Sequence, residues 1–131
     1  MELFEKSTGA TILEVAFKFH DIESRISEEV GLTLDEIRCL VTTYLRHPSC
    51  VSDLNNLLSI DPTRTSKVLK SLEEQKLIKR ELDEFDRRKS RIEISGEGKA
   101  MSEKILKLAN ELGKKYLDSI SKELLNYVED H

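Results

Sequence analysis

Cysteine is scarce in this sequence, and the two cysteines present lack the spacing of a metal or redox site. Cys39 and Cys50 stand eleven positions apart, whereas zinc and redox sites usually need a CxxC pair and disulfide scaffolds need several pairs. We therefore expect reduced thiols. Cys39 lies beside Leu40 and Val41, and a cysteine among such neighbours usually fills a core as a small apolar residue.

Long hydrophobic runs are also missing. No apolar run approaches the roughly eighteen residues that a membrane-spanning helix needs, and the first residues, MELFEKSTGA, lack the basic start and apolar middle of a secretory signal. No nucleophile stands at motif spacing from a base, no glycine-rich loop could hold phosphate, and no HExxH-type pair could bind a metal. We predict a cytoplasmic protein without a membrane contact, a cofactor or a metal site, and not an enzyme.

Charge, by contrast, is abundant and unevenly distributed. Charged residues make up 35% of the 131 positions and hydrophobic residues 38%. A chain of this length and composition can form one domain, and a second copy could complete its core. Between positions 62 and 99, eleven Lys and Arg stand against eight Asp and Glu, a net of plus 3, although the whole chain carries minus 4. A phosphate backbone responds to the face that it meets, so the acidic total does not exclude nucleic acid binding.

Apolar spacing predicts helices in the first half of the chain. From Ala10 to Val30 apolar residues recur every three or four positions, and Gly31 ends this pattern. The next segment opens with Thr33 and Glu36 at capping-box spacing and closes before Pro48, so it predicts a second helix.

Two shorter helices are predicted next. Ser52 is the expected N-cap of a helix of barely two turns that carries three leucines. Asp61 is the expected N-cap of a fourth helix, which runs from Pro62 to Gln75 with proline at its first position, where a missing N–H has no cost.

The pattern then changes to that of strands. Positions 78–82 and 91–94 alternate apolar with polar residues, as half-buried strands do, and the charged link LDEFDRRKS makes them a hairpin. Gly96 and Gly98 end the second strand, and helical spacing returns from Lys99. A polar break at 118–119 predicts that a short final helix follows a longer one.

The fourth helix has two different faces. Thr65, Val68, Leu69 and Leu72 share the inward face by their spacing. Short hydroxyls and long cations on the other side suit a helix that enters a major groove. An ordinary solvated face is the alternative, because most charged helix faces contact only water. The outward residues are Thr63, Lys67, Lys70 and Glu74, with Arg64, Ser66 and Ser71 on the flanks.

Three adjacent cations in the hairpin link favour an anionic partner. Arg87, Arg88 and Lys89 are placed at the tip of a two-stranded ribbon, where they repel one another and do nothing evident for folding. A narrow minor groove has an enhanced negative potential that favours an inserted arginine. We expect Asp86 to hold the guanidinium of Arg88 by a charge-assisted hydrogen bond.

Three segments of the sequence resemble the MarR (multiple antibiotic resistance) family of transcriptional regulators. They are LTLDEIRCL, DPTRTSKVLKSLEEQKLIKR and DRRKSRIEISGEG, and together with the element order they extend the resemblance over nearly the whole chain. The wing signature of the family is matched by Asp86, Arg88, Ile92, Ile94–Ser95 and Gly98.

The sequence departs from the family pattern in three ways. Lys76 stands where a glycine usually ends the recognition helix, for which we expect a small energetic cost and no change of fold. Ser95 replaces the usual threonine as a hydroxyl that caps the next helix. No cysteine lies near the start of the first helix, where peroxide-sensing relatives carry one, so the resemblance does not extend to an organic-peroxide sensor.

The resemblance implies a mainly α fold with a small β-hairpin wing, a winged helix-turn-helix that dimerises through its N- and C-terminal helices. In this single domain, 1–131, residues 32–98 would form the DNA-binding core, and residues 1–31 and 99–131 the dimerisation helices. The dimerisation residues would include Ile12, Val15, Phe19, Leu112, Tyr116, Leu117, Leu124 and Val128.

The same resemblance implies a transcriptional regulator, and a repressor in particular, that binds double-stranded DNA as a homodimer at a pseudo-palindromic operator. The implied DNA-binding residues are Thr63, Arg64, Ser66, Lys67 and Lys70 for the major groove, Asp86 and Arg88 for the minor groove, and Arg87 and Lys89 for phosphates. The alternative is a winged-helix module for protein interaction, whose basic wing docks on an acidic partner without sequence-specific DNA binding.

Many members of the family release DNA when a small aromatic or other lipophilic ligand binds. The candidates for lining such an effector pocket are Phe17, Phe19, His20, Arg38, Tyr44 and His47. Each of these residue types is more often an ordinary packing or surface residue than a ligand contact.

Overall fold

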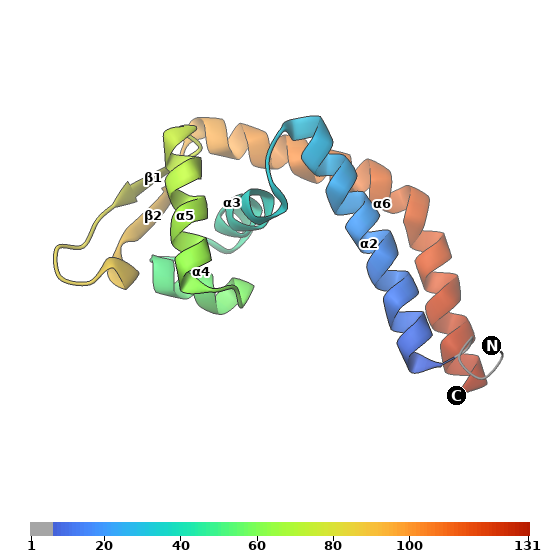
Figure 1. Ribbon diagram of the computed structural model, residues 1–131. Helices are drawn as coiled ribbons and strands as arrows, with labels where there is room; N and C mark the ends of the chain where they lie inside the picture. Colours follow the sequence, from blue (N-terminus) through green and yellow to red (C-terminus); the bar gives the residue numbers. More distant parts are fainter. Residues whose placement is uncertain (1–6) are drawn as a thin grey trace. The chain divides into compact units, whose positions relative to one another are not determined.

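In the computed structural model of the protein, residues 7–131 are described (Figure 1). The first six residues of the predicted dimerisation segment 1–31 therefore lie outside the described residues. So does most of the opening stretch MELFEKSTGA, in which no secretory signal was found. The described residues form two compact units, one of residues up to 29 together with 107–131 and the other of residues 30–106. No helix in this part of the chain is long and apolar enough to cross a membrane. The elements are α2 (Thr8–Val30), α3 (Leu34–Arg46), α4 (Val51–Leu58), α5 (Pro62–Glu74), β1 (Ile78–Glu81), η1 (Arg87–Lys89), β2 (Arg91–Ile94) and α6 (Gly96–Asp130).

Helix α3 begins at the predicted capping box. The Glu36 backbone N–H donates to Thr33 Oγ1 over 3.1 Å, and the Thr33 N–H donates to Glu36 Oε1 over 3.0 Å. Two N–H groups that would otherwise lack partners are thus satisfied reciprocally. Gly31 has a φ of 72°, a left-handed conformation that suits glycine between α2 and α3.

Helix α4 begins at a different cap from the predicted Ser52. Cys50 is the N-cap in an extended conformation and makes no side-chain capping hydrogen bond. Instead, the Val51 N–H donates to the Ser90 carbonyl oxygen over 3.0 Å, and Cys50 forms an isolated bridge with Arg91. The prediction was wrong because the start of α4 is satisfied by the wing, which is distant in sequence, and not by a neighbouring hydroxyl.

Helix α5 has the predicted start and an unusual end. The Thr63 N–H donates to Asp61 Oδ1 over 2.7 Å, and Pro62 occupies the first turn. At the other end Lys76 has a φ of 62°. The Lys76 N–H donates to the Glu73 carbonyl and the Leu77 N–H to the Leu72 carbonyl, each over 3.0 Å, which is the Schellman pattern usually built on glycine.

The wing is a two-stranded antiparallel sheet in which Ile78 pairs with Ile94 and Arg80 with Ile92. The alternation read from the sequence is confirmed, since Ile78 and Ile92 are buried while Lys79 and Glu93 are exposed. These isoleucines join a core to which α3, α4 and α5 all contribute. Its most deeply buried members are Leu40, Leu54, Leu69, Leu72, Ile78, Thr65 and Cys39.

Helix α6 begins at Gly96, three residues before the predicted start at Lys99. Ser95 is the cap as expected, because its Oγ accepts a hydrogen bond from the Gly98 N–H over 3.0 Å and donates one to the Lys76 carbonyl over 2.7 Å. Gly98 allows a close approach, since a Cβ there would lie 2.0 Å from the Leu77 carbonyl oxygen. The base of the wing and the end of α5 are therefore joined at one point.

The predicted break at Asp118–Ser119 is absent, and α6 is one helix of 35 residues. Aspartate and serine lower helix propensity by only a fraction of a kcal/mol, about 0.5 each, and no proline interrupts the segment. Ser119 Oγ accepts a hydrogen bond from Lys18 Nζ over 2.7 Å, and the neighbouring Ile120 is buried. Packing in the unit of residues up to 29 and 107–131 thus outweighs the weak local preference.

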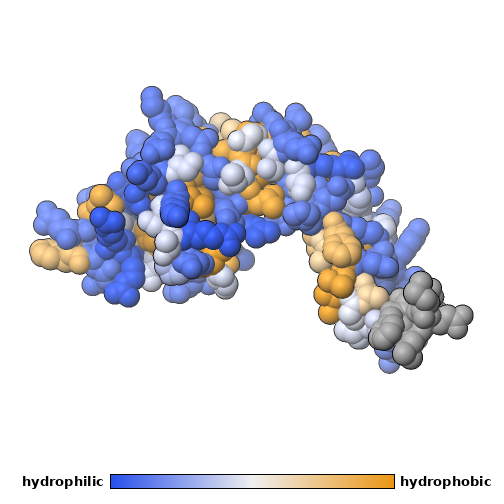
Figure 2. Space-filling model, in the orientation of Figure 1, coloured by the Kyte–Doolittle hydropathy of each residue, from blue (hydrophilic) through white to orange (hydrophobic). Residues whose placement is uncertain are grey.

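Polar contacts join α2 to α6 within that unit. Tyr116 donates to Asp21 Oδ2 over 2.6 Å, Lys18 pairs with Glu123, and the Thr8 and Tyr127 hydroxyls lie 2.7 Å apart. Large apolar side chains remain exposed on both helices, and Figure 2 shows hydrophobic surface along α2. These exposed residues are Ile12, Leu13, Phe17, Phe19, Leu117, Leu124, Leu125 and Val128.

Candidate nucleic-acid interface

A basic groove lies in the unit of residues 30–106, between α4, α5 and the wing. It has a volume of about 380 Å³. Five cations and, among the described residues, no carboxylate line it. Side chains of one sign along a groove concentrate an electrostatic potential that attracts the opposite charge. The lining residues are Val51, Asn55, Pro62, Ser66, Lys67, Lys70, Arg80, Leu82, Arg87, Arg88 and Ser90.

Helix α5 supplies one wall of the groove with its outward face. Thr65, Leu69 and Leu72 are buried as the spacing predicted, and Val68 is half-buried. The predicted outward residues Thr63, Arg64, Ser66, Lys67 and Lys70 are exposed, and three of them, Ser66, Lys67 and Lys70, line the groove.

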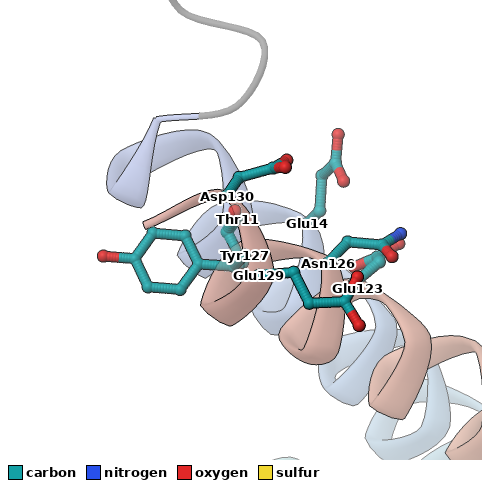
Figure 3. A pocket seen from close by; sticks show the side chains of 7 residues that line it. All are labelled: Thr11, Glu14, Glu123, Asn126, Tyr127, Glu129 and Asp130. Atoms are coloured by element: carbon teal, nitrogen blue, oxygen red, sulfur yellow. The ribbon is translucent and has the colours of Figure 1, made fainter.

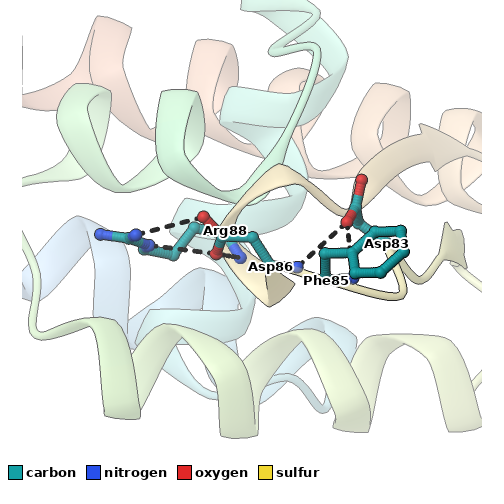
Figure 4. A network of polar contacts seen from close by, with 4 residues as sticks. All are labelled: Asp83, Phe85, Asp86 and Arg88. Atoms are coloured by element: carbon teal, nitrogen blue, oxygen red, sulfur yellow. Dashed lines mark hydrogen bonds and ion pairs between the residues drawn. The ribbon is translucent and has the colours of Figure 1, made fainter.

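The wing supplies the opposite wall through the short helix η1. The predicted pair of Asp86 and Arg88 is confirmed as a two-point contact (Figure 4), in which Nε donates to Oδ1 and Nη2 to Oδ2, each over 3.1 Å. The Arg88 backbone N–H adds a third bond to Oδ1 at 3.0 Å. The side-chain and backbone hydrogen bonds from Arg88 lower the pKa of the Asp86 carboxyl, so it stays ionised.

The sequence had suggested that the three wing cations lie at the tip of the ribbon, and this prediction was wrong. They form η1 on the returning side of the loop, where η1 contacts α4 and the following Ser90 carbonyl accepts the Val51 N–H. Asp83 shapes the preceding turn, because its Oδ1 accepts the N–H groups of Phe85 and Asp86 (Figure 4). Phe85 there is 95% exposed. This position places Arg87 and Arg88 on the groove that Ser66, Lys67 and Lys70 of α5 also line.

Arg80 and Asn55 are among the groove residues that the sequence did not predict. Arg80 stands on β1, and its Nε pairs with Glu73 Oε2 over 3.2 Å. Asn55 stands on α4, and its buried Oδ1 accepts no hydrogen bond from any described residue. The charge of Arg80 was visible in the sequence, but its alternation with apolar neighbours pointed only to a strand. Nothing in the sequence distinguished Asn55 from Asn56.

Arg64 is held by another helix. Its Nε donates to Asp35 Oδ2 over 2.7 Å and its Nη2 donates to Oδ1 over 2.8 Å, so the edge of the guanidinium makes a two-point contact with the α3 carboxylate. Arg64 does not line the basic groove, and neither does Lys89.

Cys39 has the predicted buried position. It is fully inaccessible, and burial raises the pKa of its thiol to about 12. A thiol reacts as its thiolate, so Cys39 is unreactive in the folded protein. Cys50 is half-buried. No cluster of potential metal ligands occurs among the residues that the structure describes.

The unit of residues up to 29 and 107–131 contains a polar cavity of about 400 Å³ between the first turns of α2 and the last turns of α6 (Figure 3). Acidic side chains from both helices line it, which does not suit an aromatic acid. None of the residues predicted to line an effector pocket is among them. The lining residues are Thr11, Glu14, Glu123, Asn126, Tyr127, Glu129 and Asp130.

Comparison with known proteins agrees with this geometry. The model of the MarR family matches residues 30–89, from the end of α2 to the last residue of η1. The winged helix-turn-helix segment therefore matches the MarR family. No curated protein matches the chain by sequence.

Matches to solved structures cover nearly all of this chain. Staphylococcus aureus MarR in complex with salicylate and kanamycin has 16% identity and a TM-score of 0.78, and the match covers 98% of this chain and 90% of that one. A MarR regulator from Methanosarcina mazei has 23% identity and a TM-score of 0.71, with 92% and 90% covered. The S. aureus MepR–DNA complex has 19% identity and a TM-score of 0.60, with 89% and 88% covered. At these identities the likeness establishes the fold, a winged helix with flanking helices.

Proposed function

We propose that this protein is a transcriptional regulator that binds double-stranded DNA in a sequence-specific manner. The observation that carries the proposal is the basic groove, in which Lys67 and Lys70 of the recognition helix α5 face Arg87 and Arg88 of the wing. The cations come from two elements, the recognition helix and the wing. A DNA duplex presents negative charge at two adjoining surfaces, its major and minor grooves, so it is a suitable partner for both elements. The likeness to MepR, whose structure is a complex with DNA, supports the same partner.

In this proposal α5 enters the major groove and η1 approaches the flanking minor groove. The short hydroxyls of Thr63 and Ser66 and the long chains of Lys67 and Lys70 reach base edges and phosphates. Asp86 fixes the guanidinium of Arg88 at its inner edge and leaves the remaining N–H groups for the duplex, and Arg87 and Lys89 contact phosphates.

We propose in addition that the protein acts as a homodimer. Eight large apolar side chains of α2 and α6 are about half exposed or more, and a monomer gains nothing from leaving them in water. Five of the eight predicted dimerisation residues are in this set, and Val15, Leu112 and Tyr116 are half-buried. A symmetric dimer carries two copies of the groove, so its operator is a pseudo-palindrome with half-sites about one helical turn apart.

Repression, and release by a small aromatic acid, complete the proposal. A dimer seated on a promoter blocks transcription, and the similar S. aureus MarR was solved with salicylate. Salicylate added to a preformed protein–DNA complex should raise the dissociation constant if this part of the proposal holds.

The test begins by selecting duplexes from a random pool, which should yield a sequence with dyad symmetry. On the selected duplex, Arg88→Ala should weaken binding by about 1–3 kcal/mol, roughly 5- to 150-fold. Arg46→Ala, which removes the same charge from an exposed site at the end of α3, is the matched control and should change affinity by less than about twofold.

Salt separates this function from protein interaction through the wing. A dimer that neutralises about six to ten phosphates should lose on the order of a thousandfold in affinity between 50 and 200 mM salt. A flat salt response, or equal binding by Arg88→Ala and the unaltered protein, would contradict the proposal.

A further inference from the structure

Two neighbouring carboxylates of α3 hold the recognition helix near both of its ends. Asp35 receives the two hydrogen bonds from Arg64 in the first turn of α5. Glu36 Oε2 accepts hydrogen bonds from Ser71 Oγ over 2.9 Å and from Gln75 Nε2 over 2.6 Å, at the last turn and the C-cap. Because α5 has 13 residues, these contacts span nearly its whole length.

Glu36 is unlike a surface carboxylate. Its residue is only 7% exposed, and its other oxygen, Oε1, accepts the Thr33 N–H of the capping box. Burial tends to raise the pKa of Glu36, but the hydrogen bonds from the Thr33 backbone, Ser71 and Gln75 outweigh it and hold the pKa below its usual range. The carboxylate is therefore ionised, and each oxygen has a donor.

Charge alone gives these carboxylates no reason to lie beside a DNA-binding helix, because a negative charge there repels phosphate. Their contacts are instead of the kind that fix geometry. A two-point arginine–carboxylate contact sets the relative orientation of two groups, and buried hydrogen bonds to a charged acceptor are among the stronger ones.

We propose that Asp35 and Glu36 are positioning residues for DNA binding, which fix the angle of α5 on α3 without contacting the duplex. The inference rests on the proposed function and deepens it. It also gives Arg64 a different part from the direct major-groove contact that the sequence predicted, since Asp35 engages its guanidinium from the side of α3.

The sign of the change in affinity tests the idea. Glu36→Gln keeps the size and still allows Oε1 to accept the Thr33 N–H, but its amide nitrogen cannot accept from Gln75 Nε2. It should weaken binding to the selected duplex about tenfold at constant salt, the equivalent of losing one charged hydrogen bond. Glu74→Gln removes the same charge from an exposed position at the end of α5 and should leave binding equal or slightly tighter.

A double variant provides the rescue. In Glu36→Gln with Gln75→Glu, donor and acceptor exchange places and the net charge returns, so affinity should recover to within about threefold of the unaltered protein. Asp35→Asn gives a second sign test at the other end of α5. If Arg64 served mainly as a DNA contact, freeing it would tighten binding, whereas a positioning role predicts weaker binding.

Hydrogen exchange of residues 62–75 without DNA separates this inference from the proposed function. Exchange should be faster in Glu36→Gln, normal in the double variant and unchanged in Glu74→Gln, with thermal melts showing that each is folded. Gln75→Ala, at an exposed position, serves if Glu36→Gln does not fold, and should show faster exchange and weaker binding.

Each result decides a different point. If no duplex is selected, the proposed function fails and exchange alone decides whether Glu36 holds α5. Unchanged exchange overturns the inference. Faster exchange with DNA affinity equal to that of Glu74→Gln also overturns it, because α5 would then be held to no effect on binding.

Discussion

Replacing Lys76 by glycine should make the protein more stable. Lys76 has a φ of 62° at the end of α5, and the left-handed conformation costs a residue with a Cβ about 1–2 kcal/mol. Glycine removes that cost but gains about 0.4–1 kcal/mol of conformational entropy in the unfolded chain. The balance favours Lys76→Gly by about 0.5–1 kcal/mol.

The rest of the helix end should survive this change. The two hydrogen bonds of the Schellman pattern come from the backbone N–H groups of Lys76 and Leu77, and neither uses the lysine side chain. The Ser95 hydroxyl likewise donates to the Lys76 carbonyl and not to the side chain. The stabilisation should therefore appear undiminished, as a rise in melting temperature of about 2–4 °C for a chain of this size.

Urea unfolding followed by circular dichroism measures the effect, with Lys70→Gly as the matched control. Lys70 lies inside α5, where the same substitution should destabilise by about 0.7–1 kcal/mol. Both variants lose a lysine side chain and its charge, one inside α5 and one just beyond its C-cap, so the comparison isolates the backbone conformation. If Lys76→Gly lowered the free energy of unfolding, or if both variants shifted in the same direction, the assignment of strain to Lys76 would be refuted.

Two further predictions concern the base of the wing and the buried carboxylate. Gly98→Ala should destabilise by about 2–4 kcal/mol in the same unfolding assay, because the new Cβ would lie 2.0 Å from the Leu77 carbonyl oxygen and 2.7 Å from Ile94 Cγ1; a loss below about 0.5 kcal/mol would contradict the close approach. The pKa of Glu36 is lower folded than unfolded, so its contribution is complete above the unfolded value of about 4.3 and is lost as pH falls through the folded value. The free energies of unfolding of the unaltered protein and of Glu36→Gln should therefore differ by a constant amount above about pH 5.5, and this difference should shrink as the pH falls below the unfolded value. A difference that widens in acid would show the opposite shift.

The sequence by itself determined the features that depend on near neighbours. The capping box of Thr33 and Glu36, the start of α5 at Asp61 and the pair of Asp86 and Arg88 all join residues within a few positions of one another. Hydrogen bonds over such spacings form wherever the local backbone allows them, so a pattern of residue types is enough to predict them. The same holds for the buried stripe of α5, which follows from helical periodicity.

Only the tertiary structure decided which distant residues meet. The Ser90 carbonyl replaces Ser52 at the start of α4, η1 brings Arg87 and Arg88 towards α5, and Asp35 engages Arg64. Each of these contacts joins segments more than ten positions apart in the sequence, so it depends on how the helices cross and not on local preference. Packing likewise kept α6 continuous past Ser119, where the weak helix propensity of polar residues alone had suggested a break.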